Sequence, residues 1–124
     1  MLVQILEPDF CFEDARGRLV QLVHDGYQQY NIIFSKKNVE RGNHYHKLNE
    51  EAFYVISGKF QLKAAYGDEE EQYTFKTGDM FLIPPYVIHS FRYCEDTWLA
   101  SMYSSGVENQ DGTKDIYSEQ EGTA

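Results

Sequence analysis

The stretch of sequence that decides the fold is RGNHYH, residues 41–46, followed by Glu51 and, much later in the chain, by His89. Side chains two residues apart on a β-strand point to the same face, so His44 and His46 should project together. Glu51 begins the next β-prone run, and His89 begins another run after a turn rich in glycine and proline. We therefore predict that three imidazoles and one carboxylate converge inside a barrel of strands.

Such a donor set is typical of a divalent transition-metal site. Neutral imidazole and carboxylate groups suit zinc, nickel, iron, manganese or cobalt, whereas calcium and magnesium prefer oxygen ligands. We expect His44, His46, Glu51 and His89 to bind such a metal, and these residue types do not distinguish among the candidate ions. The competing interpretation is a set of unrelated surface or core side chains, which is the usual role of a lone His-x-His pair. His24 fits no pattern, and we assign it a structural or surface role.

Short β-prone runs separated by glycine and proline turns extend in both directions from this stretch, and no segment repeats apolar residues at helical spacing. Short strands with tight turns predict an antiparallel sandwich or barrel. The chain becomes polar after Ser104, so we expect one domain over residues 1–104 and a mobile tail over residues 105–124, anchored by Ile116 and Tyr117. The predicted strands are residues 19–23, 29–34, 42–46, 52–57, 59–65, 72–75, 80–83, 89–92 and 99–103.

The composition limits the partners of this domain. The chain has 124 residues, with 11 Lys and Arg against 20 Asp and Glu, which gives a formal net charge of −9. An acidic surface repels phosphate backbones and anionic lipids, so we expect no binding to nucleic acid or membranes. Cys11 and Cys94 are too few for a disulfide scaffold and are expected to be reduced. With neither a signal peptide nor an apolar run long enough to cross a bilayer, the sequence predicts a soluble, cytoplasmic protein.

These motifs resemble those of the cupin superfamily, whose fold is a small antiparallel β-barrel of jelly-roll type. The residues that match the two cupin motifs are His44, His46, Glu51 and Gly58 in the first, and Gly78, Pro84 and His89 in the second. Tyr86 and Tyr93 stand where glycine and asparagine are usual. The resemblance implies an all-β, single-domain jelly-roll barrel that holds its metal through the three histidines and the glutamate.

Two segments also resemble cupins that act on nucleotide-linked sugars. They are residues 12–19, FEDARGRL, and residues 41–46, which carry Asp-x-Arg-Gly and Arg-Gly-x-His-Tyr. These cupins include deoxythymidine-diphosphate-sugar 3,5-epimerases, 3,4-ketoisomerases, and the cupin domain of capsule-precursor enzymes that epimerise at C3. In the epimerases the two arginines contact the diphosphate, which implies that Arg16 and Arg41 bind a nucleotide sugar here. The resemblance implies an enzyme of polysaccharide or deoxysugar biosynthesis.

The implied reaction removes a proton next to a ketone, so that C3 is epimerised or the ketone migrates. A bound metal would stabilise negative charge on the keto oxygen, and the base would be either another inward polar group, such as a tyrosine, or a metal-bound hydroxide. In a metal-free site His44 would be the base, as is the histidine of this segment in metal-free epimerases. Two alternatives stay open: a non-catalytic cupin that binds a sugar or another small molecule, and a metal-dependent dioxygenase.

We also expect a homodimer. Tyr54 and Ile56 alternate with Phe53 and Val55, which should face inward with Glu51. Some apolar surface should therefore lie on the outside of the barrel, where it is available for pairing with a second copy. Cupins commonly dimerise by pairing such faces.

Overall fold

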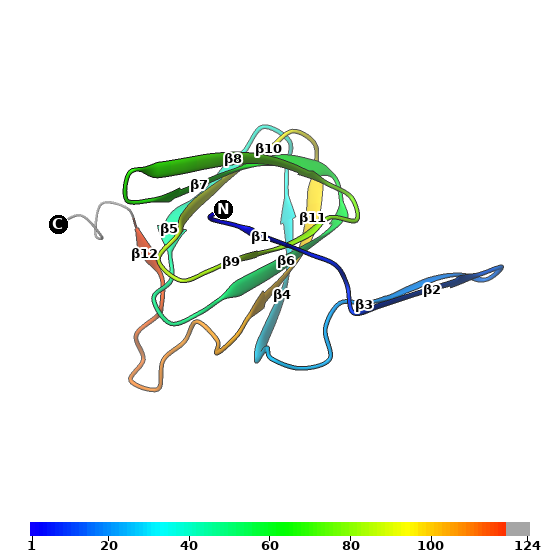
Figure 1. The fold of residues 1–124 in the computed structure, drawn as a ribbon, viewed down its shortest axis with the longest axis horizontal. Coiled ribbons are helices and arrows are strands. Elements are labelled where there is room, and N and C mark those ends of the chain that lie inside the picture. Colours follow the sequence, from blue (N-terminus) through cyan, green and yellow to red (C-terminus); the bar gives the residue numbers. More distant parts are fainter. Residues whose placement is uncertain (119–124) are drawn as a thin grey trace.

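The structure, a computed structural model, describes residues 1–118, which form a barrel of two antiparallel β-sheets with one protruding hairpin (Figure 1). The first sheet has the strand order β1-β9-β6-β11-β4, and the second has the order β12-β5-β10-β7-β8. Strands β2 and β3 pair only with each other among the described residues. In chain order the strands are β1 (Gln4–Leu6), β2 (Phe10–Asp14), β3 (Gly17–Gln21), β4 (Gln29–Ser35), β5 (Glu40–Tyr45), β6 (Glu51–Ser57), β7 (Lys59–Tyr66), β8 (Glu69–Lys76), β9 (Met80–Ile83), β10 (Ile88–Tyr93), β11 (Thr97–Tyr103) and β12 (Tyr117–Ser118).

Alternation along the strands builds the core between the two sheets. In β7, Phe60, Leu62 and Ala64 are buried, while the residues between them are exposed. A period of two turns one face of each strand inward, as an amphipathic sheet requires. The rings of Phe75 in β8 and Phe81 in β9 stack with their centroids 4.1 Å apart, which joins one sheet to the other. The two packed sheets therefore hold the side chains that project between them in fixed positions.

The all-β antiparallel architecture predicted from the sequence is confirmed. All nine predicted strands correspond to observed strands, β3 to β11, with shifts of a few residues at their ends. Strands β1, β2 and β12 were not predicted. Both β1 and β12 are short edge strands that pair with β9 and β5, so distant partners rather than local sequence make them extended. The described part of the chain contains no helix that could cross a membrane, and the cytoplasmic location stays a prediction.

The hairpin formed by β2 and β3 stands away from the barrel (Figure 1). Every residue of β2 is exposed, including Phe10 and Phe12, and Leu19 of β3 is exposed as well. At the turn, Arg16 donates to the carboxylate of Asp14 from both its backbone N–H and its guanidinium. A two-stranded hairpin alone is marginally stable in water, so its apolar side chains favour contact with a further surface.

The chain after β11 runs back along the barrel to the end of the described residues. Val107 and Asp115 are buried, and β12 pairs with β5. The polar composition predicted a tail anchored by Ile116 and Tyr117, but the most buried residue of this segment is the charged Asp115. The described part of the predicted tail is thus attached to the barrel through Asp115 and β12. Residues 119–124 of that tail lie outside the described residues.

Candidate functional site

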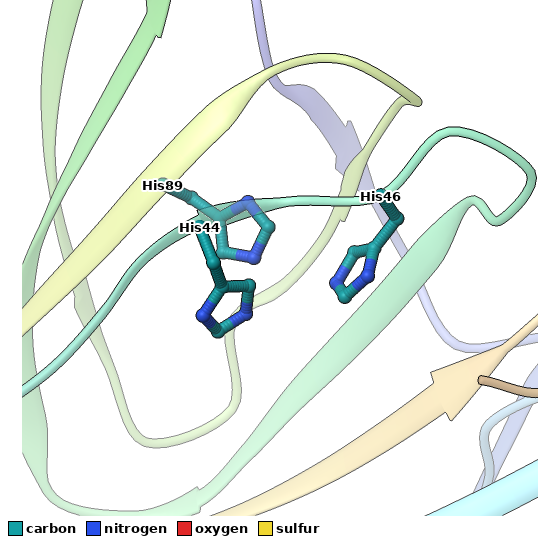
Figure 2. A group of neighbouring side chains, drawn as sticks. All are labelled: His44, His46 and His89. Atoms are coloured by element: carbon teal, nitrogen blue, oxygen red, sulfur yellow. The ribbon is translucent and has the colours of Figure 1, made fainter. Parts of the chain in front are cut away.

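Four residues singled out in the sequence lie together inside the barrel. His44 lies in β5, His46 directly follows that strand, His89 lies in β10, and Glu51 is the first residue of β6. The imidazole centroids are 4.6 Å apart for His44 and His89, 5.2 Å for His44 and His46, and 5.3 Å for His46 and His89. Figure 2 shows the three rings pointing toward one another. We call these four residues the His/Glu cluster.

An irregularity in the pairing of β5 with β10 sets two of the histidines opposite each other. His89 stands directly across from His44, and the register shifts between His89 and Ser90. Gly42 lies at this point with a φ of 98°, and a Cβ on it would come within 2.7 Å of the His89 carbonyl oxygen. Because glycine has no Cβ, β5 can approach β10 closely here. This gives a physical reason for the Arg-Gly-x-His sequence.

Backbone carbonyls fix the orientation of two of the rings. The Nδ1 of His46 donates to the carbonyl oxygen of Asp115 at 2.6 Å, and the Nδ1 of His89 donates to that of Val87 at 2.9 Å. A carbonyl oxygen can only accept, so each Nδ1 carries a hydrogen and each Nε2 faces the cluster. Metal-binding histidines in proteins are commonly held in this way.

Glu51 supplies the negative charge of the cluster. Its Oε1 lies 3.1 Å from the Nε2 of His46 and 3.7 Å from the Nε2 of His89, and its Oε2 accepts a hydrogen bond from the Ser101 hydroxyl at 2.6 Å. Glu51 is buried, as are the next inward residues of β6, Phe53 and Val55. The predicted inward orientation of this face of the strand is therefore present.

Burial and charge compete to set the protonation of the cluster. Burial lowers the pKa of His89 to about 4, and burial together with the nearby His46 lowers the pKa of His44. Burial alone would lower the pKa of His46 as well, but its hydrogen bond to the Glu51 carboxylate raises it. Burial alone would raise the pKa of Glu51, but the hydrogen bond from His46 lowers it. At neutral pH, His44 and His89 are therefore neutral imidazoles beside an anionic Glu51.

This donor set fits a divalent cation. A ligand nitrogen from each of the three imidazoles lies within 4.8 Å of the other two. The Nε2 of His89 is buried and has no hydrogen-bond partner among residues 1–118, which is costly for a polar atom unless something else satisfies it. A cation between the rings would satisfy this nitrogen, and the carboxylate of Glu51 would offset its charge.

A cavity of about 90 Å³ opens beside the cluster. Its lining includes His44, Glu51 and His89, as well as Tyr103 from the end of β11. The Tyr103 ring stands edge-on to the ring of His46, with centroids 5.1 Å apart. Burial and the nearby charge of Glu51 raise the pKa of Tyr103, so its phenol keeps its proton at neutral pH. The cavity thus brings a neutral imidazole and a protonated phenol together.

Sequence reasoning did not single out Tyr103 or Ser101. The signal that could have found them is the period of two along β11, in which Leu99, Ser101 and Tyr103 share a face. Leu99 and Tyr103 line the cavity, and Ser101 donates to Glu51. Once Leu99 is placed in the core, the other two residues follow it inward.

The two arginines predicted to bind substrate lie in different places. Arg41 contributes to the cavity lining, and its guanidinium donates to the Ser35 hydroxyl at 2.7 Å and to the Phe34 carbonyl at 3.2 Å. Arg16 lies at the turn of the protruding hairpin, with 86% of its side chain exposed. Within one chain, the structure therefore brings Arg41 to the cavity and leaves Arg16 outside its lining.

A barrel of two antiparallel sheets with an inward His/Glu cluster is the cupin fold, which solved structures share with this protein. More particularly, the chain belongs to the polysaccharide biosynthesis C-terminal domain family, whose profile matches residues 12–110. That match covers most of β2, strands β3 to β11 and the whole His/Glu cluster, and it leaves out the edge strands β1 and β12. No curated protein gives a significant sequence match to the chain.

Solved structures of nucleotide-sugar enzymes share the fold. A 3,4-ketoisomerase from Helicobacter canadensis has a TM-score of 0.82 and 18% identity, over 98% of this chain and 94% of its own. The dTDP-4-dehydrorhamnose 3,5-epimerase from Sulfolobus tokodaii has a TM-score of 0.71 and 23% identity, over 83% and 70%. A mutant of the 3,4-ketoisomerase QdtA from Thermoanaerobacterium thermosaccharolyticum, in complex with TDP-4-keto-6-deoxyglucose, has a TM-score of 0.74 and 17% identity, over 90% and 85%. These similarities confirm the cupin fold predicted from the sequence motifs.

Proposed function

We propose that this protein is a metal-binding cupin that acts on a nucleotide-linked keto sugar, as an epimerase or ketoisomerase of polysaccharide or deoxysugar biosynthesis. The observation that carries the proposal is the buried His/Glu cluster beside a cavity that also presents Tyr103 and Arg41. The family and the fold shared with sugar-nucleotide epimerases and ketoisomerases support it. One of those ketoisomerases was solved with TDP-4-keto-6-deoxyglucose bound, and we assign the keto group of this class of ligand to the cavity, whose volume of about 90 Å³ leaves the rest of the ligand outside it.

The metal ligands in this proposal are His44, His46, Glu51 and His89. When bound, a divalent transition metal such as zinc, nickel, iron or manganese would supply Lewis-acid stabilisation of negative charge on the keto oxygen of the substrate. The protein contributes the orientation of its donors, because the carbonyls of Asp115 and Val87 hold His46 and His89 through their Nδ1 atoms.

Proton transfer in this proposal falls to His44 and Tyr103. The lowered pKa of His44 leaves its imidazole neutral at pH 7, so in the metal-free protein its free ring nitrogen can accept a proton from the carbon next to the ketone. The raised pKa of Tyr103 keeps its phenol protonated, so the hydroxyl can donate a proton back. With His44 held as a metal ligand, Tyr103 would perform both halves of the transfer: its phenolate, which the charge of a nearby cation would favour, would take the proton from the carbon, and the resulting phenol would return it. Both epimerisation and ketone migration need this removal and return of a proton.

The diphosphate of the substrate is assigned to the two arginines. Arg41 lines the cavity and presents a planar, permanently charged guanidinium, which suits bidentate contact with phosphate oxygens. Arg16 sits on a hairpin that stands away from its own barrel, so it would serve the cavity of a second copy of the chain. Local cations are needed because the protein as a whole carries a net charge of −9.

A homodimer accounts for the apolar residues outside the barrel. On the edge strand β4, Tyr30 and Ile32 are 59% and 63% exposed, and Trp98 of the neighbouring β11 is 45% exposed. Ile56 of β6 is exposed, as the alternation along that strand predicted, whereas Tyr54 is half-buried. We call Tyr30, Ile32, Phe34, Ile56 and Trp98 the outer apolar face. A second copy that covers this face would remove the largest apolar side chains of β4 and β11 from water.

Solvent deuterium incorporation tests the proposed reaction. The purified protein is incubated in D₂O with TDP-4-keto-6-deoxyglucose, and deuterium at the carbons next to the ketone is followed by NMR. We expect incorporation, with a fall of about 100-fold or more in its rate for Tyr103→Phe, because the phenolic proton is lost. Tyr66→Phe, a tyrosine exposed at the β7–β8 turn, is the matched control and should keep the wild-type rate.

The same experiment separates the alternatives. Binding of the sugar nucleotide without deuterium incorporation would identify a binding module and overturn the catalytic proposal. Consumption of O₂ by the metal-loaded protein would identify a dioxygenase. If the protein neither binds sugar nucleotides nor incorporates deuterium into them, sugar nucleotides are not its substrates.

A further inference from the structure

Asp115 lies far from the His/Glu cluster in sequence but is bonded to it directly. It is completely buried, in a segment whose composition predicted a polar tail. Its backbone carbonyl oxygen accepts the Nδ1 hydrogen of His46 at 2.6 Å. Its backbone N–H donates to the carbonyl of Val107 at 2.7 Å, which fixes the position of the residue against the rest of the segment.

The carboxylate of Asp115 holds the chain that directly follows His46. Its oxygens accept backbone N–H groups from Lys47 at 2.8 Å, Leu48 at 2.9 Å and Asn49 at 3.1 Å, and the side-chain amide of Asn49 at 2.8 Å. Four N–H donors on one buried carboxylate fully compensate its burial, because charge-assisted hydrogen bonds are strong. The loop that carries His46 is therefore fastened at consecutive peptide groups.

Asn49 extends this fastening to the end of β11. Its amide nitrogen donates to the Gly106 carbonyl at 2.9 Å, and its amide oxygen accepts the backbone N–H of Ser105 at 2.8 Å. These residues follow Tyr103, whose ring lies against His46. One buried carboxylate thus connects His46, the loop after it, and the end of the strand that presents Tyr103.

We propose that Asp115 is a positioning residue for the His/Glu cluster: it sets the tautomer and the orientation of His46 from two directions, through its carbonyl and through its carboxylate. The inference concerns the cluster named in the proposed function, but it applies to the protein with or without a metal or a sugar. With Nδ1 bonded to the Asp115 carbonyl, the other ring nitrogen, Nε2, is directed at the cluster, where it lies 3.1 Å from Oε1 of Glu51.

The tautomer is measured first, on the full-length, metal-free, wild-type protein. Long-range ¹H–¹⁵N NMR of the imidazoles reports which ring nitrogen carries the hydrogen. We expect Nδ1 of His46 to carry a hydrogen, whether or not Nε2 carries one as well. A His46 ring with no hydrogen on Nδ1 would overturn the proposal, whatever the catalytic activity of the protein.

The substitution Asp115→Asn then tests the role of the carboxylate, with Glu108→Gln as the matched control. Glu108 is an exposed acidic residue of the same segment, so its loss changes the charge equally without touching the loop. We expect Asp115→Asn to shift the His46 ring signals and to weaken Zn²⁺ binding by about 10–100-fold in competition with a chromogenic chelator, as loss of such supporting contacts does elsewhere. Glu108→Gln should leave both unchanged.

The outcomes separate this inference from the proposed function. A folded Asp115→Asn protein with wild-type His46 signals and wild-type Zn²⁺ affinity would contradict the positioning role. If Asp115→Asn does not fold, the NMR result on the wild-type protein still decides the tautomer. A positive result in both measurements, with no turnover of any keto sugar, would support the positioning role and count against the catalytic proposal alone.

Discussion

Gly42 illustrates how one residue without a side chain positions the histidines of the His/Glu cluster. Gly42 has a φ of 98°, and a Cβ at this position would lie 2.7 Å from the His89 carbonyl oxygen. A residue with a side chain therefore does not fit here without a shift of the backbone. We predict that Gly42→Ala lowers the free energy of unfolding by about 1–3 kcal/mol, because the new methyl group adds both backbone strain and a collision. Gly67→Ala is the control, since Gly67 also has a positive φ, of 59°, but nothing within 4 Å. Urea unfolding of the two variants measures the difference, and equal losses would show that the close approach is unimportant.

His46 is the residue on which the metal assignment is most easily tested. Its Nε2 faces the cluster and its Nδ1 is held by a carbonyl, so His46→Ala removes one donor without removing another. We predict that the wild-type protein purifies with a bound transition metal and that the His46→Ala protein does not, as measured by elemental analysis. His24→Ala is the control, because His24 is exposed and pairs with Asp9 outside the barrel. Full metal occupancy in His46→Ala would disprove the ligand assignment.

At the scale of the element, the C-terminal segment should make stability depend on pH. Burial alone would raise the pKa of Asp115, but the hydrogen bonds from Asn49, Lys47 and Leu48 outweigh it and lower the pKa below its ordinary value of 3.8. A carboxyl group with a lowered pKa in the folded state stabilises the fold above its unfolded pKa, and this contribution is lost as the pH falls through the folded value. Asp115→Asn should therefore lower the free energy of unfolding by about 2–3 kcal/mol at pH 7 and by less at pH 3.

Urea titrations of both proteins at several pH values check this prediction. The difference in the free energy of unfolding between wild type and Asp115→Asn should be constant from pH 7 to about pH 5 and should become smaller below about pH 4. If this difference does not change with pH, the carboxylate stabilises the fold through its shape and not through its charge.

Strands and turns were largely predictable because their signals are local. Alternation of apolar residues and the placement of glycine and proline were enough for β3 to β11. The short strands β1 and β12 lacked such a signal, because they are extended only through pairing with β9 and β5. The same limit applies to Asp115, which looks like a solvated tail residue until its four N–H partners from residues 47–49 are in place.

The convergence of the His/Glu cluster could be predicted because two of its members share a strand face and the other two each open a strand. The position of Arg16 could not, since the sequence does not show that the β2–β3 hairpin leaves the barrel. The period of two along β11 places Tyr103 on the inward face with Leu99, but its position beside the ring of His46 follows only from the pairing of β11 with β6.

At the scale of the whole molecule, the outer apolar face predicts the assembly state. Ile32, on the edge strand β4, is the most exposed residue of this face, and a lysine there would place a charge in a buried interface. We predict that the wild-type protein is a dimer in light scattering and that Ile32→Lys is a monomer at micromolar concentration. Tyr66→Lys, at an exposed apolar residue of the other sheet, should remain a dimer. A monomeric wild-type protein would remove the homodimer from the proposal.

The bond between His46 and the carbonyl of Asp115 joins positions that are 69 residues apart. During synthesis from the N-terminus, a growing chain exposes the first two imidazoles of the His/Glu cluster, His44 and His46, long before residue 115 has left the ribosome. Until then the ring of His46 lacks the acceptor that orients it. Metal binding should accordingly follow the synthesis of residue 115. A chain that ends before this residue should therefore bind metal weakly.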